Sequence, residues 1–209
     1  MEYRIVRSKR KSLVLTLQDG EPVVRAPHGV PEEKIDAFVN KHRLWLARRV
    51  SERKNLPSFE LGGRITLFGK EYLLAEGRTR ISGETIYLPR EKTEAALVRL
   101  LKKTTLGYMS ALTAALAEQY GFSYNSVKVS SAHSRWGSCN SKGNISYSFR
   151  VALLPVALSV YVAVHELCHT RQLNHSAKFW REVERVLPDY KLRRKALRQN
   201  SAIMGLFRS

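Results

Sequence analysis

The sequence YVAVHELCHTRQLNH, residues 161–175, decides the fold class of this chain. His165 and His169 are four residues apart, so on a helix their imidazoles lie on one face and can converge on a single ion. Glu166 follows the first histidine about a quarter-turn round the helix, close enough to reach a water beside that ion. The pattern HExxH therefore predicts a metal centre on a helix, with Glu166 as the catalytic base.

The sequence before this motif predicts that the helix is buried. Residues 153–164 carry no charge and are mostly apolar, and Pro155 suits the start of a helix that continues through the motif. Two histidines and a glutamate at the end of a buried helix are costly to desolvate unless something binds them. Zinc would bind them, lower the pKa of its water to about 7 and polarise a carbonyl. We therefore favour a zinc site over two ordinary core histidines.

A zinc site of this kind needs a third protein ligand, and His175 is the first candidate. The spacing H-E-x-x-H-x5-H brings His175 back to the site only if the helix ends near Arg171 and the chain reverses. Asn174 tolerates the left-handed backbone that such a reversal often requires. A helix that continues unbroken would favour another donor. The alternatives are Glu182, Glu184 and His133, with Cys139 as a softer ligand.

The first ninety residues predict a strand-rich lobe with one helix, which we take as a domain over residues 1–90. The pair Asp19-Gly20 indicates a tight turn. Pro31, followed by two acidic residues, predicts the start of a helix that runs to about Lys54. Short apolar or alternating segments predict strands at residues 12–17, 23–24, 65–68, 72–74 and 86–88.

Residues 91–209 predict a catalytic domain. Apolar positions recur with a helical period from Glu91 to Tyr120, and Gly121 is suited to end that helix. The elements expected after it are strands at 127–130 and 145–151 around a Gly/Ser/Asn-rich loop at 137–144, the motif helix, and helices over about 176–187 and 188–202. Because the strands precede the helices and do not alternate with them, the expected fold class is α+β.

The composition is that of a folded protein with a large excess of basic residues. Apolar residues make up 44% of the 209 positions and charged residues 26%, and 36 Lys and Arg against 18 Asp and Glu give a net charge of +18. Such a charge attracts polyanions such as nucleic acid or nucleotides, and it also serves solubility. We expect a cytoplasmic protein without membrane association, since the apolar runs are short, the N-terminus does not look like a signal peptide and there are two cysteines.

Several blocks around the motif resemble one family. The blocks are Arg135-Trp136-Gly137-Ser138-Cys139, Gly143-Asn144-Ile145, Pro155, the HELCH motif, and the stretch from Asn174-His175-Ser176 to Phe179-Trp180. In these blocks, within about residues 134–187, the chain resembles the YgjP-like metallopeptidases, relatives of the SprT-like and WLM zincins. The resemblance implies that His165, His169 and His175 are zinc ligands and that Glu166 is the catalytic residue. It also implies a minimal zincin-type fold, with a small antiparallel sheet over the active-site helix.

The sequence identifies the substrate-binding residues less closely than the metal ligands. Ser148-Phe149 and Thr170 stand where the family usually has Asn-Trp and an apolar residue, and these departures concern the substrate groove rather than the metal site. Arg135 and Ser138 lie at a strand end beside a flexible loop and are candidates for substrate binding, Arg135 through a substrate anion or the transition-state oxyanion. Alternatively, Arg135 pairs with a carboxylate while Trp136 packs against the ligand helix.

These observations together predict a monomeric zinc metallopeptidase with one Zn²⁺ per chain. A zinc-bound water, activated by Glu166, would attack a carbonyl of a peptide or protein substrate that lies extended along a sheet edge. One alternative is a metal-dependent nucleoside triphosphate pyrophosphatase, and another is a nucleic-acid-tethered protease or binding module. The nucleic-acid alternative rests on the basic last helix, with Lys191, Arg193, Arg194, Lys195 and Arg198.

Overall fold

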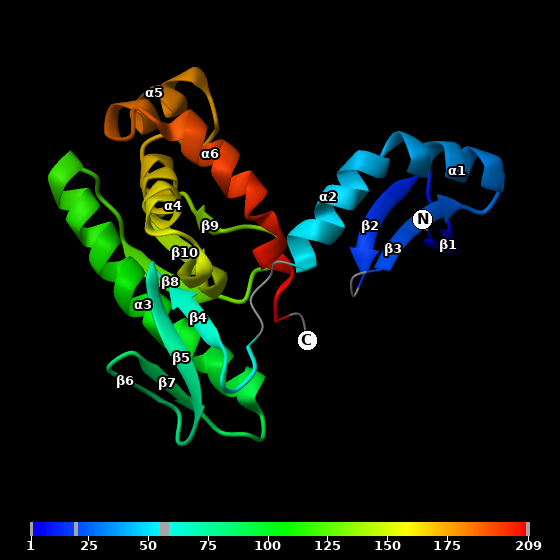
Figure 1. The fold of residues 1–209 in the computed structure, drawn as a ribbon. Coiled ribbons are helices and arrows are strands. Elements are labelled where there is room, and N and C mark those ends of the chain that lie inside the picture. Colours follow the sequence, from blue (N-terminus) through cyan, green and yellow to red (C-terminus); the bar gives the residue numbers. More distant parts are fainter. Residues whose placement is uncertain (1, 19–20, 55–58, 208–209) are drawn as a thin grey trace. The chain divides into compact units, whose positions relative to one another are not determined.

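The computed structural model describes residues 2–18, 21–54 and 59–207 of the chain (Figure 1). Contacts divide the chain into two compact units, Met1–Leu56 and Pro57–Ser209. The division falls at residue 56, whereas the strand pattern suggested a boundary near residue 90. The reason is that the strands between residues 64 and 88 bury their apolar side chains in the same core as the helix that follows them.

The first unit is a small mixed sheet with two helices. β3 (Glu21–Pro27) lies between β1 (Arg4–Ser8), to which it is parallel, and β2 (Val14–Gln18), to which it is antiparallel. The single helix expected up to Lys54 is interrupted at His42, which divides it into α1 (Glu32–Lys41) and α2 (Arg43–Lys54). The unit's core is formed by Val24, Ala26, Ile35, Val39 and Leu46. The turn expected at Asp19-Gly20 lies outside the described residues.

The second unit begins with a four-stranded sheet packed on a long helix. The strands lie in the order β4 (Arg64–Leu67), β5 (Lys70–Glu76), β7 (Thr85–Leu88) and β6 (Arg80–Ser82), and β5 and β7 are parallel. The helix is α3 (Thr93–Tyr120), close to its predicted bounds, and it ends at Gly121 with a φ of 68° that glycine adopts without steric cost. Leu74, Ile86, Leu97 and Leu101 are fully buried between the sheet and this helix.

A second sheet of this unit lies next to the motif helix. Its strand order is β8 (Ser126–Ser130), β10 (Asn144–Ser148) and β9 (Gly137–Cys139), so β9 is an edge strand. The antiparallel sheet that the resemblance implied is therefore mixed, because β8 runs parallel to β10. β9 forms in a segment expected to be a loop. The predicted strand at 145–151 stops early, and Phe149–Leu153 forms a 3₁₀ helix, η1.

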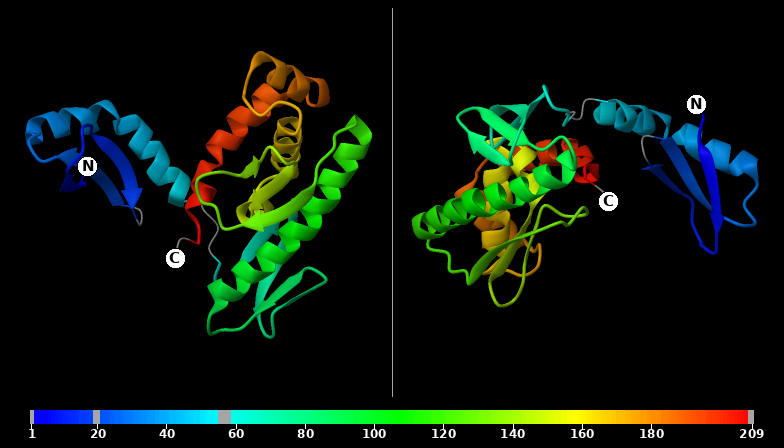
Figure 2. Two further views of the ribbon diagram at one scale, coloured as in Figure 1. Left: turned by 180° about the vertical axis from the view of Figure 1, so that it is seen from behind. Right: turned by 90° about the horizontal axis from the view of Figure 1, so that it is seen from below.

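The motif helix, α4 (Val156–His169), is the centre of the second unit. It contacts α3, β9, α5 (Ala177–Val186) and α6 (Tyr190–Gln199), and a short 3₁₀ helix, η2 (Ser201–Gly205), follows. Figures 1 and 2 show α4 between α3 on one side and the α5–α6 pair on the other. Pro155 caps its start, as expected, and ten of its 14 residues are buried. This burial positions the two motif histidines at an end of the helix that other elements surround.

No helix among the described residues is long and apolar enough to cross a membrane.

A buried arginine joins three segments of the second unit. Arg150 in η1 is 1% exposed. Its guanidinium donates hydrogen bonds to the carbonyls of Ser131 and Ala132 on one side and of Leu206 and Phe207 on the other. Loss of this side chain would leave several partly buried carbonyls without their donors, and an unpaired polar group away from water is costly.

We expect Arg150→Met to lower the free energy of unfolding of the second unit by roughly 3 kcal/mol, because a buried, multiply hydrogen-bonded cation is removed. Urea denaturation followed by tryptophan fluorescence measures the change. Arg78→Met, at an exposed position, is the control and should change stability by no more than about 0.5 kcal/mol. Equal stabilities for the two variants would contradict the role assigned to Arg150.

Candidate metal centre

The structure brings the three predicted histidines together. One ring nitrogen from each of His165, His169 and His175 lies within 4.8 Å of the others. The Nε2 atoms of His165 and His175 are 3.0 Å apart, and the three ring centroids are separated by 4.8–5.0 Å. Of the three, His175 is exposed. Such a cluster could hold a metal ion and leave one side of that ion open to solvent.

The reversal of the chain after α4 puts His175 in place. α4 ends at His169, and the amides of Arg171 and Gln172 both donate to the carbonyl of Cys168, which closes the last turn. The helix thus ends where the histidine spacing required. Asn174 does not take the left-handed backbone that we expected, because it is not among the residues with positive φ. The reversal is made with ordinary backbone angles.

The protonation state of the buried histidines favours metal binding at this cluster. Burial, with smaller contributions from the neighbouring His169 and His175, lowers the pKa of His165 to about 3. Burial also lowers the pKa of His169. The Nδ1 atom of His169 lies 3.0 Å from the carbonyl of Gln172, and since a carbonyl only accepts, Nδ1 carries the proton and leaves the Nε2 lone pair for a ligand. Neutral imidazoles are the form that binds a metal ion, so these residues fit one.

Aromatic rings from α5 and α6 support the histidines. Phe179 stacks on His169 with ring centroids 4.5 Å apart and meets the other two histidines edge-on. Trp180 stacks on His175, and Tyr190 stacks on Trp180 from the far side. These packed rings restrict the imidazole orientations. In the sequence, Phe179 and Trp180 were noted only because they match the family resemblance. The spacing of the motif did not indicate which residues they would contact.

Glu166 is buried against a glycine of the edge strand. It is 5% exposed, and burial raises the pKa of its carboxyl to about 8, against an opposing effect of the Arg135 guanidinium. A divalent cation beside it would favour the ionised form. A Cβ atom on Gly137 of β9 would lie 2.6 Å from Oε1 of Glu166 and 2.7 Å from its Cγ. Gly137 therefore leaves space for the carboxylate. In the sequence, the only sign of this role is that a glycine stands inside the RWGSC block.

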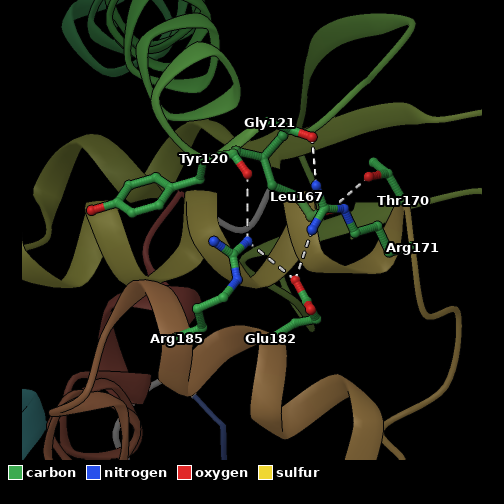
Figure 3. A network of polar contacts seen from close by, with 7 residues as sticks. All are labelled: Tyr120, Gly121, Leu167, Thr170, Arg171, Glu182 and Arg185. Carbon is green, nitrogen blue, oxygen red and sulfur yellow. Dashed lines mark hydrogen bonds and ion pairs between the residues drawn. The ribbon is translucent and has the colours of Figure 1, made fainter.

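The alternative ligands are occupied or distant. Glu182 is held by Arg171 at 2.9 Å and by Arg185 at 3.2 Å. The two arginines also reach the carbonyls of Gly121 and Tyr120, so this network joins α5 to the ends of α3 and α4 (Figure 3). Glu184 is exposed and His133 lines cavities near β9 and η1, and neither belongs to the histidine cluster among the described residues.

Neither cysteine belongs to the histidine cluster. Burial raises the pKa of the Cys139 thiol to about 11, with a smaller contribution from Glu166. Burial likewise raises the pKa of Cys168 to about 12. Both thiols therefore stay protonated at neutral pH, and thiolate is the form that binds metal. The geometry favours His175 as the third donor among the described residues.

Three imidazoles that can hold a metal beside a buried carboxylate define the class of metal-dependent hydrolases. Comparison with known families makes this specific: the pattern of the YgjP-like metallopeptidase domain matches residues 11–200, and the chain belongs to this family. Among solved structures, the metallopeptidase zymogen of Pyrococcus abyssi abylysin is similar, with 25% identity over 43% of this chain and 90% of that chain and a TM-score of 0.40. A search of curated proteins found no match.

We expect His175→Ala to weaken binding of a divalent metal by more than about 100-fold, since loss of a direct ligand costs at least as much as loss of a residue that orients one. Competition titration with Zn²⁺ and Co²⁺ measures the affinity. His133→Ala serves as the matched control, because it removes a histidine that lies outside the cluster. An unchanged affinity in His175→Ala would show that the third donor is another group.

Proposed function

We propose that this chain is a zinc metallopeptidase in which His165, His169 and His175 hold one Zn²⁺ and Glu166 is the general base. The observation that carries the proposal is the convergence of three imidazoles next to a buried carboxylate, with His175 exposed. Structural zinc sites usually take four protein ligands, whereas catalytic sites take three and keep a position for water or substrate. The three-histidine set is of the second kind, and the family assignment supports the same conclusion.

In the proposed reaction, Glu166 carries the proton from the attacking water to the leaving group. Zinc in this site would polarise the scissile carbonyl and lower the pKa of water. Glu166 would take a proton from the attacking water on a carboxylate oxygen and then pass it to the nitrogen of the leaving amine. Burial suits the residue to this cycle, because it raises the pKa of the carboxyl and so makes the carboxylate a stronger base.

The edge strand β9 offers a place for the substrate backbone. β9 pairs with β10 on one side and is last in the strand order of its sheet, which leaves the other side for an extended peptide. Gly137 in the same strand adjoins Glu166, so a peptide on this edge would lie beside the base. Arg135 and Ser138 line a cavity at this edge, and we propose that they contact the substrate.

The structure offers less support for the two alternatives. Phosphoryl transfer usually recruits Mg²⁺ through carboxylates, and the metal-competent cluster among the described residues contains histidines alone. In the basic last helix, Arg193 is paired with Asp189 and donates to the carbonyl of Ala157, while Arg194 lies 4.5 Å from the Trp180 ring. Part of that charge is therefore used inside the fold. We propose no nucleotide- or nucleic-acid-directed activity.

We expect Glu166→Gln to lower kcat for peptide hydrolysis by about 10²–10⁴-fold, because the general base is lost while the charge of the imidazoles is unchanged. Hydrolysis of a broad set of fluorogenic peptides measures activity, and elemental analysis measures bound zinc. The expected combination is full metal content with lost turnover. A variant that cleaves peptides at the normal rate would exclude Glu166 as the base.

We expect Gly137→Ala to lower kcat by about 100-fold, since the added methyl group displaces the Glu166 carboxylate by an ångström or so. Gly107→Ala in α3 is the matched control, because no atom lies within 4 Å of the position that its Cβ would take. Kinetics of both variants, with metal content and thermal unfolding, complete the comparison. If both glycine variants keep full activity, the close approach of β9 to Glu166 has no catalytic importance.

A further inference from the structure

Two cavities share His133 as a lining residue, and the smaller of them is also lined by residues of β9. The smaller has a volume of about 310 Å³ and is lined by Arg135 and Gly137 together with five serines, among them Ser138 of β9. The larger has a volume of about 830 Å³ and is lined by residues from the first half of α3, by η1 and by Phe207. Since His133 lines both, the two cavities follow one another from β9 toward the start of α3.

The smaller cavity can bind carboxylates. Three of its five serines can supply hydroxyl donors, whereas the hydroxyls of Ser130 and Ser148 already donate to backbone carbonyls. Arg135 supplies a guanidinium that is exposed and has no ion pair among the described residues. A planar guanidinium matches a carboxylate with two parallel hydrogen bonds. No acidic side chain lines this cavity. An acidic group of a ligand would therefore meet no like charge on the side chains that line the cavity.

The larger cavity carries a strong positive charge. Four basic side chains line it, Lys92, Arg99, Lys102 and Arg150, against the single carboxylate of Glu94. Arg150 is buried and holds the backbone of the wall through carbonyls, while the other three basic residues are exposed. The positive end of the α3 dipole adds to the field, because the helix begins at Thr93.

The dimensions fit a short stretch of extended chain. Lys92 and Lys102 are ten residues apart along α3, which corresponds to about 15 Å of helix axis. An extended peptide covers that length with about four or five residues. The basic side chains of the cavity are thus spread over a length that four or five extended residues would cover.

We propose that these two cavities bind an acidic segment of the substrate, a run of about four or five residues with several Asp or Glu that continues from the peptide held on β9. This inference rests on the zinc metallopeptidase proposed above and names its substrate class. The carboxylates nearest the cleavage site meet Arg135 and the serines, and those farther along meet Lys92, Arg99 and Lys102.

A polypeptide fits this surface better than a nucleic acid does. Binding of single strands relies on open aromatic faces on which bases stack. Of the aromatic residues that line the larger cavity, Phe149 is 1% exposed, and Phe207 is stacked on Phe59 with ring centroids 4.6 Å apart. The smaller cavity is also lined by Gly137 and Ser138 of the edge strand β9, and an edge strand can pair with an extended peptide backbone.

The test compares pairs of labelled peptides that differ only in a run of five residues, which are all Glu in one peptide and all Gln in the other. In one pair the run precedes a central neutral sequence, and in a second pair it follows that sequence. Binding to zinc-loaded Glu166→Gln protein is measured by fluorescence anisotropy, so that turnover is not needed. We expect at least tenfold tighter binding of the Glu peptide for one placement of the run at low salt. This advantage should shrink as salt is raised to 0.5 M, because exposed charges are screened.

Lys102 and Lys103 provide a matched pair of variants. They are adjacent exposed lysines of α3, and only Lys102 lines the cavity. We expect Lys102→Glu to abolish the preference for the Glu peptide and Lys103→Glu to retain most of it, with thermal unfolding unchanged in both. In the cleavage assay, Lys102→Glu should raise KM for the acidic peptide and leave kcat unchanged.

Equal affinity for the Glu and Gln peptides, or equal losses in the two lysine variants, would overturn the inference. So would an oligonucleotide whose binding depends on Lys102 while peptide binding does not. Failure of the proposed function gives a different result, in which no peptide is cleaved by the wild type under any condition. Cleavage of neutral peptides without a preference for acidic ones would contradict this inference and leave the proposed peptidase function intact.

Discussion

The metal centre of the second unit depends on holding three imidazoles together at the end of a buried helix. Desolvation opposes protonation of His165 and His169, so these rings present lone pairs rather than charges to one another. Lone pairs directed at a common point repel unless a cation lies between them. The rings therefore have to be held by packing, which Phe179 and Trp180 provide. The arginine–glutamate network that joins α5 to α3 and α4 stabilises the position of those aromatic residues in turn.

The same helix also sets the position of the edge strand. α4 directs Glu166 toward β9, and the strand can approach only because residue 137 has no side chain. The backbone of this short strand is fixed from the other side, where the amide of Ser148 donates to the carbonyl of Trp136 and β10 pairs with β9. Glu166 and the strand edge are thus positioned by one close contact, so a change in either moves both.

The sequence predicted the local chemistry better than the arrangement of elements. The spacing of His165, His169 and His175, with α4 ending where the spacing required, led to the observed cluster because helical geometry relates sequence separation directly to position. The mixed sheet, β9 and the boundary at residue 56 were not predicted, since strand pairing depends on contacts between distant residues. The supporting role of Gly137 was missed for the same reason: the atom that it accommodates belongs to residue 166.

The net charge of +18 is best understood by asking where each cation lies. Arg150 satisfies buried carbonyls, Arg171 and Arg185 share Glu182, and Arg194 covers the Trp180 ring. These arginines replace interactions that other proteins make with neutral groups, so their charge says little about partners. Of the other cations that line the two cavities, Lys102 lies 6.0 Å from the centre of the Phe149 ring, and Lys92, Arg99 and Arg135 are exposed and have no ion pair among the described residues. A global charge excess therefore becomes informative only after the structural cations are set aside, and the proposed acidic substrate segment depends on the exposed cations that line the two cavities.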